Sequence, residues 1–297
     1  MKLIDDINEV HHILLGIATA FHQICTKHDI PYCMLGGTML GAVRHKGFIP
    51  WDDDMDFAVP REHYEELATL LEKELPQDYR CLTYSNCEQI KYPFIKIEDR
   101  RTCIDDKSLD CPLEEKIGLN IDVFPLDRCD KKIWRIKRVF FYIALQTLFF
   151  VESPTYSKPK ALIKKLFKKL APKNRLYFVK KLENAMLHAG NAGYIGNLIG
   201  RWREKETFKA EVYQNLADYS FEGITLRGPK DYDTYLTQMY GNYMQLPPKE
   251  QQLVHVEGAY WRHGRSVSDT SHINIKERLS WSGECKHAEL QMLQPEN

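Results

Sequence analysis

The sequence lacks several features that would place the chain in a specialised class of protein. It shows no internal repeat, no low-complexity segment and no Gly/Ser/Pro-rich linker, so nothing divides it into independent units. Its longest apolar run, residues 139–151, is shorter than the roughly 20 residues that a membrane-spanning helix needs. Net charge is absent too, because 41 basic residues balance 41 acidic ones, and this argues against a nucleic-acid-binding protein.

Metal-binding cysteine pairs are also missing. None of the eight cysteines forms a CxxC pair, and the first residues turn acidic at Asp5 and Asp6 instead of reading as a secretory leader. We therefore expect reduced thiols and a cytoplasmic protein, with peripheral contact at the inner face of the cell membrane as a further expectation.

What is present is an ordinary globular composition with an α+β pattern. The 297 residues are 43% hydrophobic and 28% charged, enough for a sizeable core. Residues 1–130 alternate helix and strand and predict an α+β core with a mixed sheet. Residues 131–216 read as a helical, basic arm, and residues 217–297 as a C-terminal segment that packs back on the core. We expect one continuous domain.

The periodicity also predicts individual elements. We expect helices over 5–29, 38–43 (with Thr38 as N-cap), 61–75 and 230–240. We expect strands over 32–35, 54–59, 79–84, 94–98, 101–104, 117–124 (ending before Pro125) and 221–226.

Two carboxylates in Asp54-Met55-Asp56-Phe57 are the first sign of chemistry. On a strand, residues i and i+2 point to the same face, so Asp54 and Asp56 would lie side by side. Two such charges resist ionising together unless a cation lies between them, and Mg²⁺ or Mn²⁺ prefers carboxylate oxygens. Read alone, the acidic run 52–54 could also be a solvated loop or a helix-capping cluster.

Gly36-Gly37-Thr38 lies at a predicted strand-to-helix turn just upstream. Glycines let a phosphate approach the backbone, and a helix N-terminus offers N–H groups to an anion, although Gly-Gly alone is usually only a turn. Asp122, between Ile121 and Val123 on a predicted strand, is either an edge-strand residue on the solvent-exposed face of the sheet or a third metal ligand. A phosphate cradle beside a carboxylate set suits metal-assisted attack at phosphorus.

These residues resemble a known family. The stretch from Gly36 to Asp56, with Gly41-Ala42-Val43-Arg44-His45 and Ile49-Pro50-Trp51 inside it, resembles the LicD family, to which fukutin-type phospho-sugar transferases are related. Segments 94–102, 121–127 and 240–248 resemble the same family, although Asn242 stands where many relatives have an acidic residue.

The resemblance implies that residues 1–130 form a catalytic core of the nucleotidyltransferase fold. It also implies a metal-dependent phosphotransferase that moves a phospho-alcohol from a CDP-alcohol donor such as CDP-choline. The acceptor would be a hydroxyl of a cell-surface glycan (lipopolysaccharide or teichoic acid) or its lipid-linked precursor. Asp54, Asp56 and Asp122 would be catalytic and would hold Mg²⁺ or Mn²⁺. The resemblance further implies a set of residues that bind the nucleotide phosphates: Gly36, Gly37, Thr38, Arg44, His45 and Lys96. Arg44 and Lys96 could instead be surface ion-pair members, and His45 an exposed loop residue.

A basic, amphipathic stretch follows the core. Residues 158–181 carry many lysines and no acid, beside the apolar run 139–151, which suits an anionic membrane surface. A helical subdomain whose apolar stripes pack together explains the pattern equally well. Two other functions stay open: a nucleotidyltransferase that moves a nucleoside monophosphate from a nucleoside triphosphate to a small molecule, and an inactive membrane-associated binding module.

Overall fold

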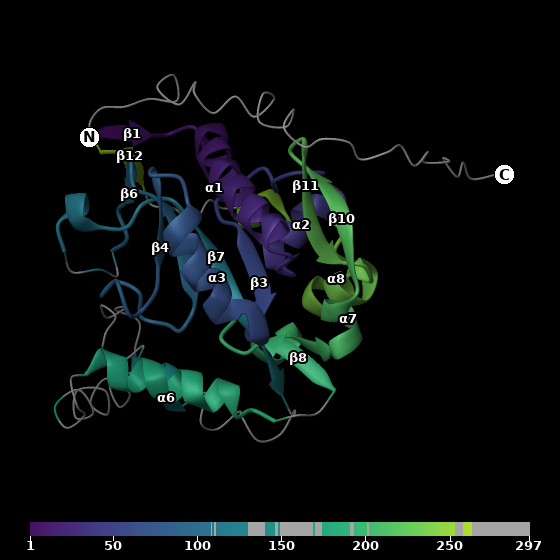
Figure 1. Cartoon of the computed structure of the whole chain (residues 1–297). Coiled ribbons are helices and arrows are strands. Elements are labelled where there is room, and N and C mark those ends of the chain that lie inside the picture. The colour runs from purple at the N-terminus through teal and green to yellow at the C-terminus, as the bar shows by residue number, and fades with distance from the viewer. Residues whose placement is uncertain are drawn as a thin grey trace. The chain divides into compact units, whose positions relative to one another are not determined.

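The computed structural model describes residues 1–107, 109, 111–129, 140–145, 148, 169, 174–190, 193–200, 202–252 and 258–262. At their centre is a mixed seven-stranded sheet in the order β2-β3-β7-β5-β4, with β8 paired to β7 and β9 to β8 (Figure 1). Its strands are β2 (Cys33–Met34), β3 (Asp56–Pro60), β4 (Tyr79–Leu82), β5 (Ile95–Asp99), β7 (Asn120–Cys129), β8 (Tyr194–Asn197) and β9 (Thr207–Lys209). The predicted α+β class with a mixed-sheet core is confirmed.

Two helices cover one face of this sheet. Helices α1 (Ile7–Lys27) and α3 (Arg61–Glu74) both contact β7 and lie across the strands in Figure 1. The ring of Phe57 in β3 is fully buried and lies 5.0 Å from that of Phe21 in α1. Since successive side chains of a strand point to opposite faces, Asp56 points away from α1. The sheet therefore has one face packed under helices and one face that carries acidic groups.

Helix α1 begins and ends as the sequence predicts. The carboxylate of Asp6 accepts the backbone N–H of Asn8 at 2.9 Å, which satisfies one of the donors that the first turn leaves unpaired. Its apolar side chains recur at three- and four-residue steps and are buried against the sheet.

Helix α2 (Gly36–Arg44) corrects one prediction. Thr38 was expected to cap this helix, but the N-cap is Leu35, and no side chain makes a capping bond there. The glycines form the first turn of the helix instead of preceding it. The Thr38 hydroxyl instead accepts the backbone N–H of Asp56 at 2.8 Å, so it ties the helix to the start of β3.

Strand β7 is longer than predicted, because it continues through Pro125 to Cys129. Its antiparallel pairing with β5 ends at Val123, and its pairing with β8 starts at Leu126. Pro125 lies between these two ladders, where its missing N–H has no antiparallel partner to lose.

The prediction of helix throughout 131–216 is wrong for the segments that form β8 and β9, which extend the sheet. Helix α6 (Arg175–Leu187) does lie in that region.

The C-terminal part holds a hairpin where a single strand was predicted. Strands β10 (Leu216–Phe221) and β11 (Ile224–Pro229) pair antiparallel, and the turn residues Glu222 and Gly223 have φ of 48° and 81°. A two-residue turn with positive φ at both positions matches the twist of the flanking strands. The remaining elements are η1 (Leu113–Glu115), η2 (Arg203–Glu206), α7 (Ala210–Gln214), α8 (Tyr232–Tyr240), η3 (Lys249–Gln251) and a separate sheet of β1 (Lys2–Ile4), β12 (Ala259–Trp261) and β6 (Thr102–Ile104).

Most of the lysine-rich stretch 158–181, including Lys164, Lys165 and Lys168, lies outside the described residues, as does the C-terminal segment beyond residue 262. In the part that is described, we find no helix with the length and apolarity needed to cross a membrane. The described cysteines are free thiols, with no disulfide among them.

Candidate active site

The candidate site is centred on a row of three charged residues on adjacent strands. Strands β3 and β7 run parallel with Asp56 opposite Asp122, and β5 runs antiparallel to β7 with Lys96 opposite the same Asp122. Register partners on neighbouring strands point to the same face, so the order across the sheet is carboxylate, carboxylate, ammonium. The structure thus brings together Asp56, Asp122 and Lys96, which the sequence predicts as site residues from three separate segments.

Lys96 pairs directly with Asp122. Its Nζ donates to Oδ1 of Asp122 and, at 2.9 Å, to the Oδ1 of Asn120. Both members of the ion pair are about one-fifth exposed, so the pair is open to a ligand and only partly screened by water. A partly exposed ion pair is compatible with both a surface role and a site role, so phosphate binding by Lys96 stays a prediction.

Asp56 is the most perturbed carboxylate of the site. Burial raises its pKa well above the ordinary value, and the charges of Asp54, Asp122 and Glu206 raise it further, while the ammonium of Lys96 opposes them. Its backbone is held on both sides of the residue: its N–H donates to Thr38, and its carbonyl accepts the N–H of Leu35 at 2.9 Å. Asp54, two residues before β3 begins, is the exposed member of the acidic group and lies outside the strand that was predicted to start there.

The first turn of α2 lies against these carboxylates. Gly36 has φ of 51°, and its N–H donates to the hydroxyl of Tyr235 at 2.9 Å. A β-carbon at Gly36 would stand 3.4 Å from Oδ2 of Asp56. Glycine is favoured at 36 by the left-handed backbone, and the acidic group lies at van der Waals distance from this position. Gly37 is constrained by space instead, because a β-carbon there would lie 2.4 Å from Oδ2 of Asp52.

Asp52 is a site residue that the sequence analysis did not single out. Burial raises its pKa to about 7, helped by the charges of Asp54 and Asp53. Its backbone carbonyl is 2.6 Å from Nε2 of His11, whose ring stacks on Phe48. The acidic run therefore does not lie in solvent as a loop of mobile carboxylates: Asp52 and Asp53 are turned into the protein, and Asp54 faces out.

Arg44 and His45 lie at the other end of α2, away from its first turn. Arg44 donates from NH1 to the carbonyl of Tyr243 at 2.8 Å and from Nε to Nδ1 of His45 at 3.4 Å. Burial and the Arg44 charge lower the pKa of His45, and an Nδ1 that accepts this bond carries no proton. Neither contact places a cation beside the carboxylate row, so phosphate binding by Arg44 and His45 stays a prediction.

Two residues from distant segments join the site. The pKa of Tyr240, at the end of α8, is raised by burial and then by the charges of Asp56, Asp52 and Glu206. Glu206 is buried, and its Oε1 accepts the backbone N–H of Trp202 at 2.8 Å. No spacing in the sequence connects Glu206 to the acidic motif. Tyr240 could have been found, since it opens the segment 240–248 that resembles the family.

The carboxylates suit a hard divalent cation by their chemistry, and the mutual repulsion around Asp56 is what such an ion would relieve. Over the residues that the structure describes, however, no group of three or more His, Cys, Asp or Glu side chains is placed to hold a metal ion. Asp122 is instead paired with Lys96. A metal site formed by Asp54, Asp56 and Asp122 therefore stays a prediction.

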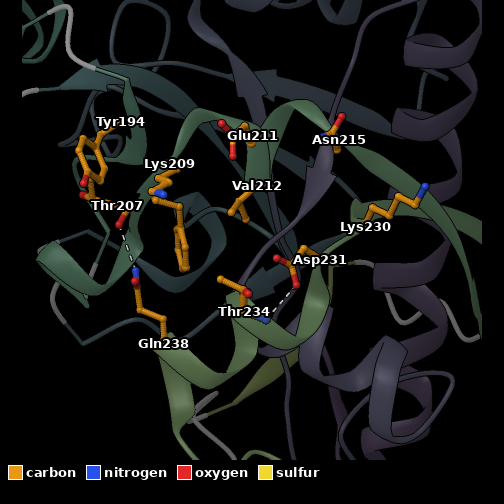
Figure 2. Close-up of a pocket in the computed structure, with 11 residues that line it drawn as sticks. Tyr194, Thr207, Lys209, Glu211, Val212, Asn215, Lys230, Asp231, Thr234 and Gln238 are labelled. Atoms are coloured by element: carbon orange, nitrogen blue, oxygen red, sulfur yellow. Dashed lines mark hydrogen bonds between the residues drawn. The ribbon is translucent and has the colours of Figure 1, made fainter.

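A separate pocket of about 880 Å³ lies on the outer side of α8 (Figure 2). It is lined by residues of β8, β9, α7, the end of β11 and the first turns of α8: Tyr194, Thr207, Phe208, Lys209, Glu211, Val212, Asn215, Lys230, Asp231, Thr234 and Gln238. None of the predicted site residues lines it. Helix α8 turns Tyr235 toward α2 and Thr234 and Gln238 toward this pocket.

Known proteins resemble this chain over the segment that holds the candidate site and over most of its length. The LicD/FKTN/FKRP nucleotidyltransferase domain family matches residues 29–135, which hold α2 and the carboxylate row. The chain is 31% identical over 270 residues to the "Lipopolysaccharide cholinephosphotransferase LicD" of Haemophilus influenzae, covering 86% of this chain and 97% of that protein. It is 39% identical over 84 residues, 28% of each chain, to the "Uncharacterized protein RP689" of Rickettsia prowazekii. A crystal structure of ANT(2″)-Ia in complex with adenylyl-2″-tobramycin covers 57% of this chain at 13% identity and a TM-score of 0.24, a likeness too weak to support a shared fold.

Proposed function

This chain belongs to the LicD family, and we propose that it moves a phosphocholine-like group from a CDP-alcohol to a hydroxyl of a cell-surface glycan or its lipid-linked precursor. The predicted family and the predicted phosphotransferase class are confirmed by the relative that matches most of the chain. The donor, the metal and the acceptor belong to the proposal. Phosphocholine as the group and lipopolysaccharide as the acceptor come from the activity that the name of that relative states.

The observation that carries the proposal is the register of Asp56, Asp122 and Lys96 beside the first turn of α2. Phosphoryl transfer requires positioned charge, because the protein forms few covalent bonds itself. A helix N-terminus attracts the donor phosphates, and Lys96 supplies a positive charge on the same face as the two carboxylates.

Each group has a role in the proposed reaction. Asp54, Asp56 and Asp122 would hold Mg²⁺ or Mn²⁺, which neutralises phosphate charge and orients the donor. The acceptor oxygen forms a bond to the phosphorus that carries the alcohol, and the bond from that phosphorus to the oxygen of CMP breaks. Asp122 takes the proton of the acceptor hydroxyl, and Lys96 holds this carboxylate in place through its ion pair.

The same carboxylates could serve a nucleotidyltransferase, so the released product distinguishes the two reactions. Purified protein would be incubated with Mg²⁺ or Mn²⁺ and with CDP-choline, CDP-ethanolamine, CDP-glycerol, CDP-ribitol or nucleoside triphosphates. We expect slow release of CMP from a CDP-alcohol and no pyrophosphate. Release of pyrophosphate from a triphosphate, with no CMP from any CDP-alcohol, would favour the nucleotidyltransferase. Metal binding without turnover of any donor would favour the inactive module.

Peripheral membrane contact through residues 131–181 is part of the same proposal, because a lipid-linked acceptor is presented at a membrane. The support is the run of lysines at 158–181, most of which lies outside the described residues. Co-sedimentation with anionic vesicles tests it. Substitution of Lys164, Lys165, Lys168 and Lys169 by glutamine is expected to weaken binding, and unchanged binding would favour a helical subdomain that only packs.

A further inference from the structure

One tryptophan near the site is open to solvent while the other described indoles are not. Trp261 is fully buried and donates from Nε1 to Glu9 at 2.7 Å, and Trp51 is half-buried with its ring edge-on to His45. Trp202 is 46% exposed. A single exposed aromatic residue is ordinary on a protein surface, so the neighbours of this ring decide whether it has a role.

The neighbours of Trp202 form a corner of defined chemistry. Its ring centroid lies 6.0 Å from that of Tyr240, with the planes at 75°, so the two rings make adjoining walls. Its backbone N–H donates to the buried carboxylate of Glu206. The ammonium of Lys205 lies 5.8 Å from the indole centroid, so the ring already interacts with a cation. We call Trp202, Tyr240 and Glu206 the aromatic corner.

The aromatic corner adjoins the reacting groups. The Tyr240 hydroxyl and Oδ2 of Asp56 both lie within 4 Å of one point, the position where a β-carbon of Gly36 would stand, at 3.7 and 3.4 Å. The corner is therefore next to the first turn of α2, where the donor phosphates are proposed to bind. A group joined to the phosphate by a short ethylene bridge would reach it.

A quaternary ammonium is the group that such a corner suits. It has no N–H and cannot donate hydrogen bonds, so proteins hold it against the faces of aromatic rings in a field of negative charge. Resting on the proposed function above, we propose that Trp202, Tyr240 and Glu206 bind the trimethylammonium group of the donor and select choline over primary amines. The sequence offered no way to choose among its tryptophans and tyrosines for this role, because their spacing does not show which rings meet.

The test compares two donors that differ only at the ammonium group. Steady-state release of CMP from CDP-choline and CDP-ethanolamine would be measured for wild type, Trp202→Leu and Trp202→Phe. We expect Trp202→Leu to raise KM for CDP-choline about tenfold, the effect of losing one cation–π contact, and to change KM for CDP-ethanolamine less than about twofold. Trp202→Phe should recover most of the loss. Equal changes for both donors, or no change, would overturn the proposal.

Tyr177→Leu is the matched control. Tyr177 is 47% exposed on α6, and Lys181 lies 5.6 Å from its ring centroid, so it offers the same kind of contact away from the carboxylate row. This variant should leave both KM values unchanged. If the wild type releases CMP from neither donor, the proposed function has failed, and the corner is then tested alone. A saturation-transfer NMR signal from tetramethylammonium that is lost in Trp202→Leu would uphold the corner, and an equal signal in both proteins, or none in wild type, would overturn it.

Discussion

Asp56 and Asp122 are register partners on two neighbouring parallel strands, although 65 residues separate them in the chain. Parallel pairing places their carboxylates on one face, and the burial of Asp56 makes their repulsion strong. Such a pair lowers the stability of the fold unless a positive charge offsets it, and Lys96 does this on the third strand. An arrangement of like charges that costs stability and is partly exposed is typical of a site built for a charged ligand.

Removing the Asp56 charge should abolish divalent metal binding and activity. Asp56→Asn keeps the shape of the side chain while eliminating one ligand, and a loss of about 100-fold or more in turnover is expected. Calorimetric titration with Mn²⁺ measures binding apart from turnover. Asp218→Asn is the control, because Asp218 is an exposed carboxylate on β10. Wild-type Mn²⁺ affinity in Asp56→Asn would show that the metal site lies elsewhere.

Replacing Lys96 should damage the site through Asp122. In Lys96→Met the Asp122 carboxylate loses the ammonium with which it pairs, and phosphate charge loses a neutralising group. We expect a fall in kcat that Lys96→Arg partly restores, with near-wild-type circular dichroism in both. Lys107→Met, which removes a mostly exposed ammonium from Asp105, is the control. Equal activity of Lys96→Met and wild type would leave Lys96 with no catalytic role.

The pair of Arg61 and Asp127 should dominate the stability of the layer where α3 meets β7. Arg61 donates from Nε and NH2 to the two carboxylate oxygens of Asp127, both at 2.7 Å, and the carboxylate is nearly buried. Arg61→Met leaves the Asp127 carboxylate buried without this ion-pair partner. The free energy of unfolding should fall by about 3–5 kcal/mol, as urea denaturation would show. Adding Asp127→Asn should recover part of the loss. Lys27→Met, which breaks the exposed contact with Glu74, should leave the urea midpoint near that of wild type.

His22 should make the fold sensitive to mild acid. Burial, and then the charge of Arg227, lowers its pKa below the ordinary value, and its Nδ1 lies 2.6 Å from the Tyr32 hydroxyl. Because the folded pKa is depressed, the unfolded chain binds the proton first, and stability present above about pH 6.5 is lost as the pH falls through the folded pKa. The melting temperature should therefore drop between pH 7 and 5, and His22→Gln should flatten this slope. A slope unchanged in the variant would assign the sensitivity to other groups.

Sequence patterns predicted best the elements whose structure depends on residues close together in the chain. The alternation of Asp56 with the apolar Phe57 was predicted and is found in β3, although the strand starts at Asp56 and not at Asp54, and periodicity gives α1. The register of Asp56 with Asp122 depends on how distant strands pair, which no local pattern contains. The β10–β11 hairpin was missed because Glu222-Gly223 is not among the strongest turn pairs, and β8 and β9 are too short to show a period.

The site residues that the sequence did not predict are also those whose position depends on tertiary packing. Asp52 lies inside the recognised motif, but no local pattern in the run of three aspartates shows that Asp52 is the one beside Gly37. Glu206 and Tyr240 reach the carboxylates through the tertiary packing of η2 and α8, and only Tyr240, in the segment 240–248 that resembles the family, had a signal in the sequence. Sequence reasoning therefore located the acidic centre and left open the side chains that would shape donor selectivity.

The most direct measurement is release of CMP from CDP-choline by purified protein, with Mg²⁺ present, after removal of divalent ions by EDTA, and with Asp56→Asn. The account predicts slow release with Mg²⁺, none after EDTA, recovery when Mg²⁺ is restored, and none at any metal concentration in the variant. Release that persists after EDTA, or that Asp56→Asn retains, would contradict a metal-dependent reaction centred on the pair of Asp56 and Asp122.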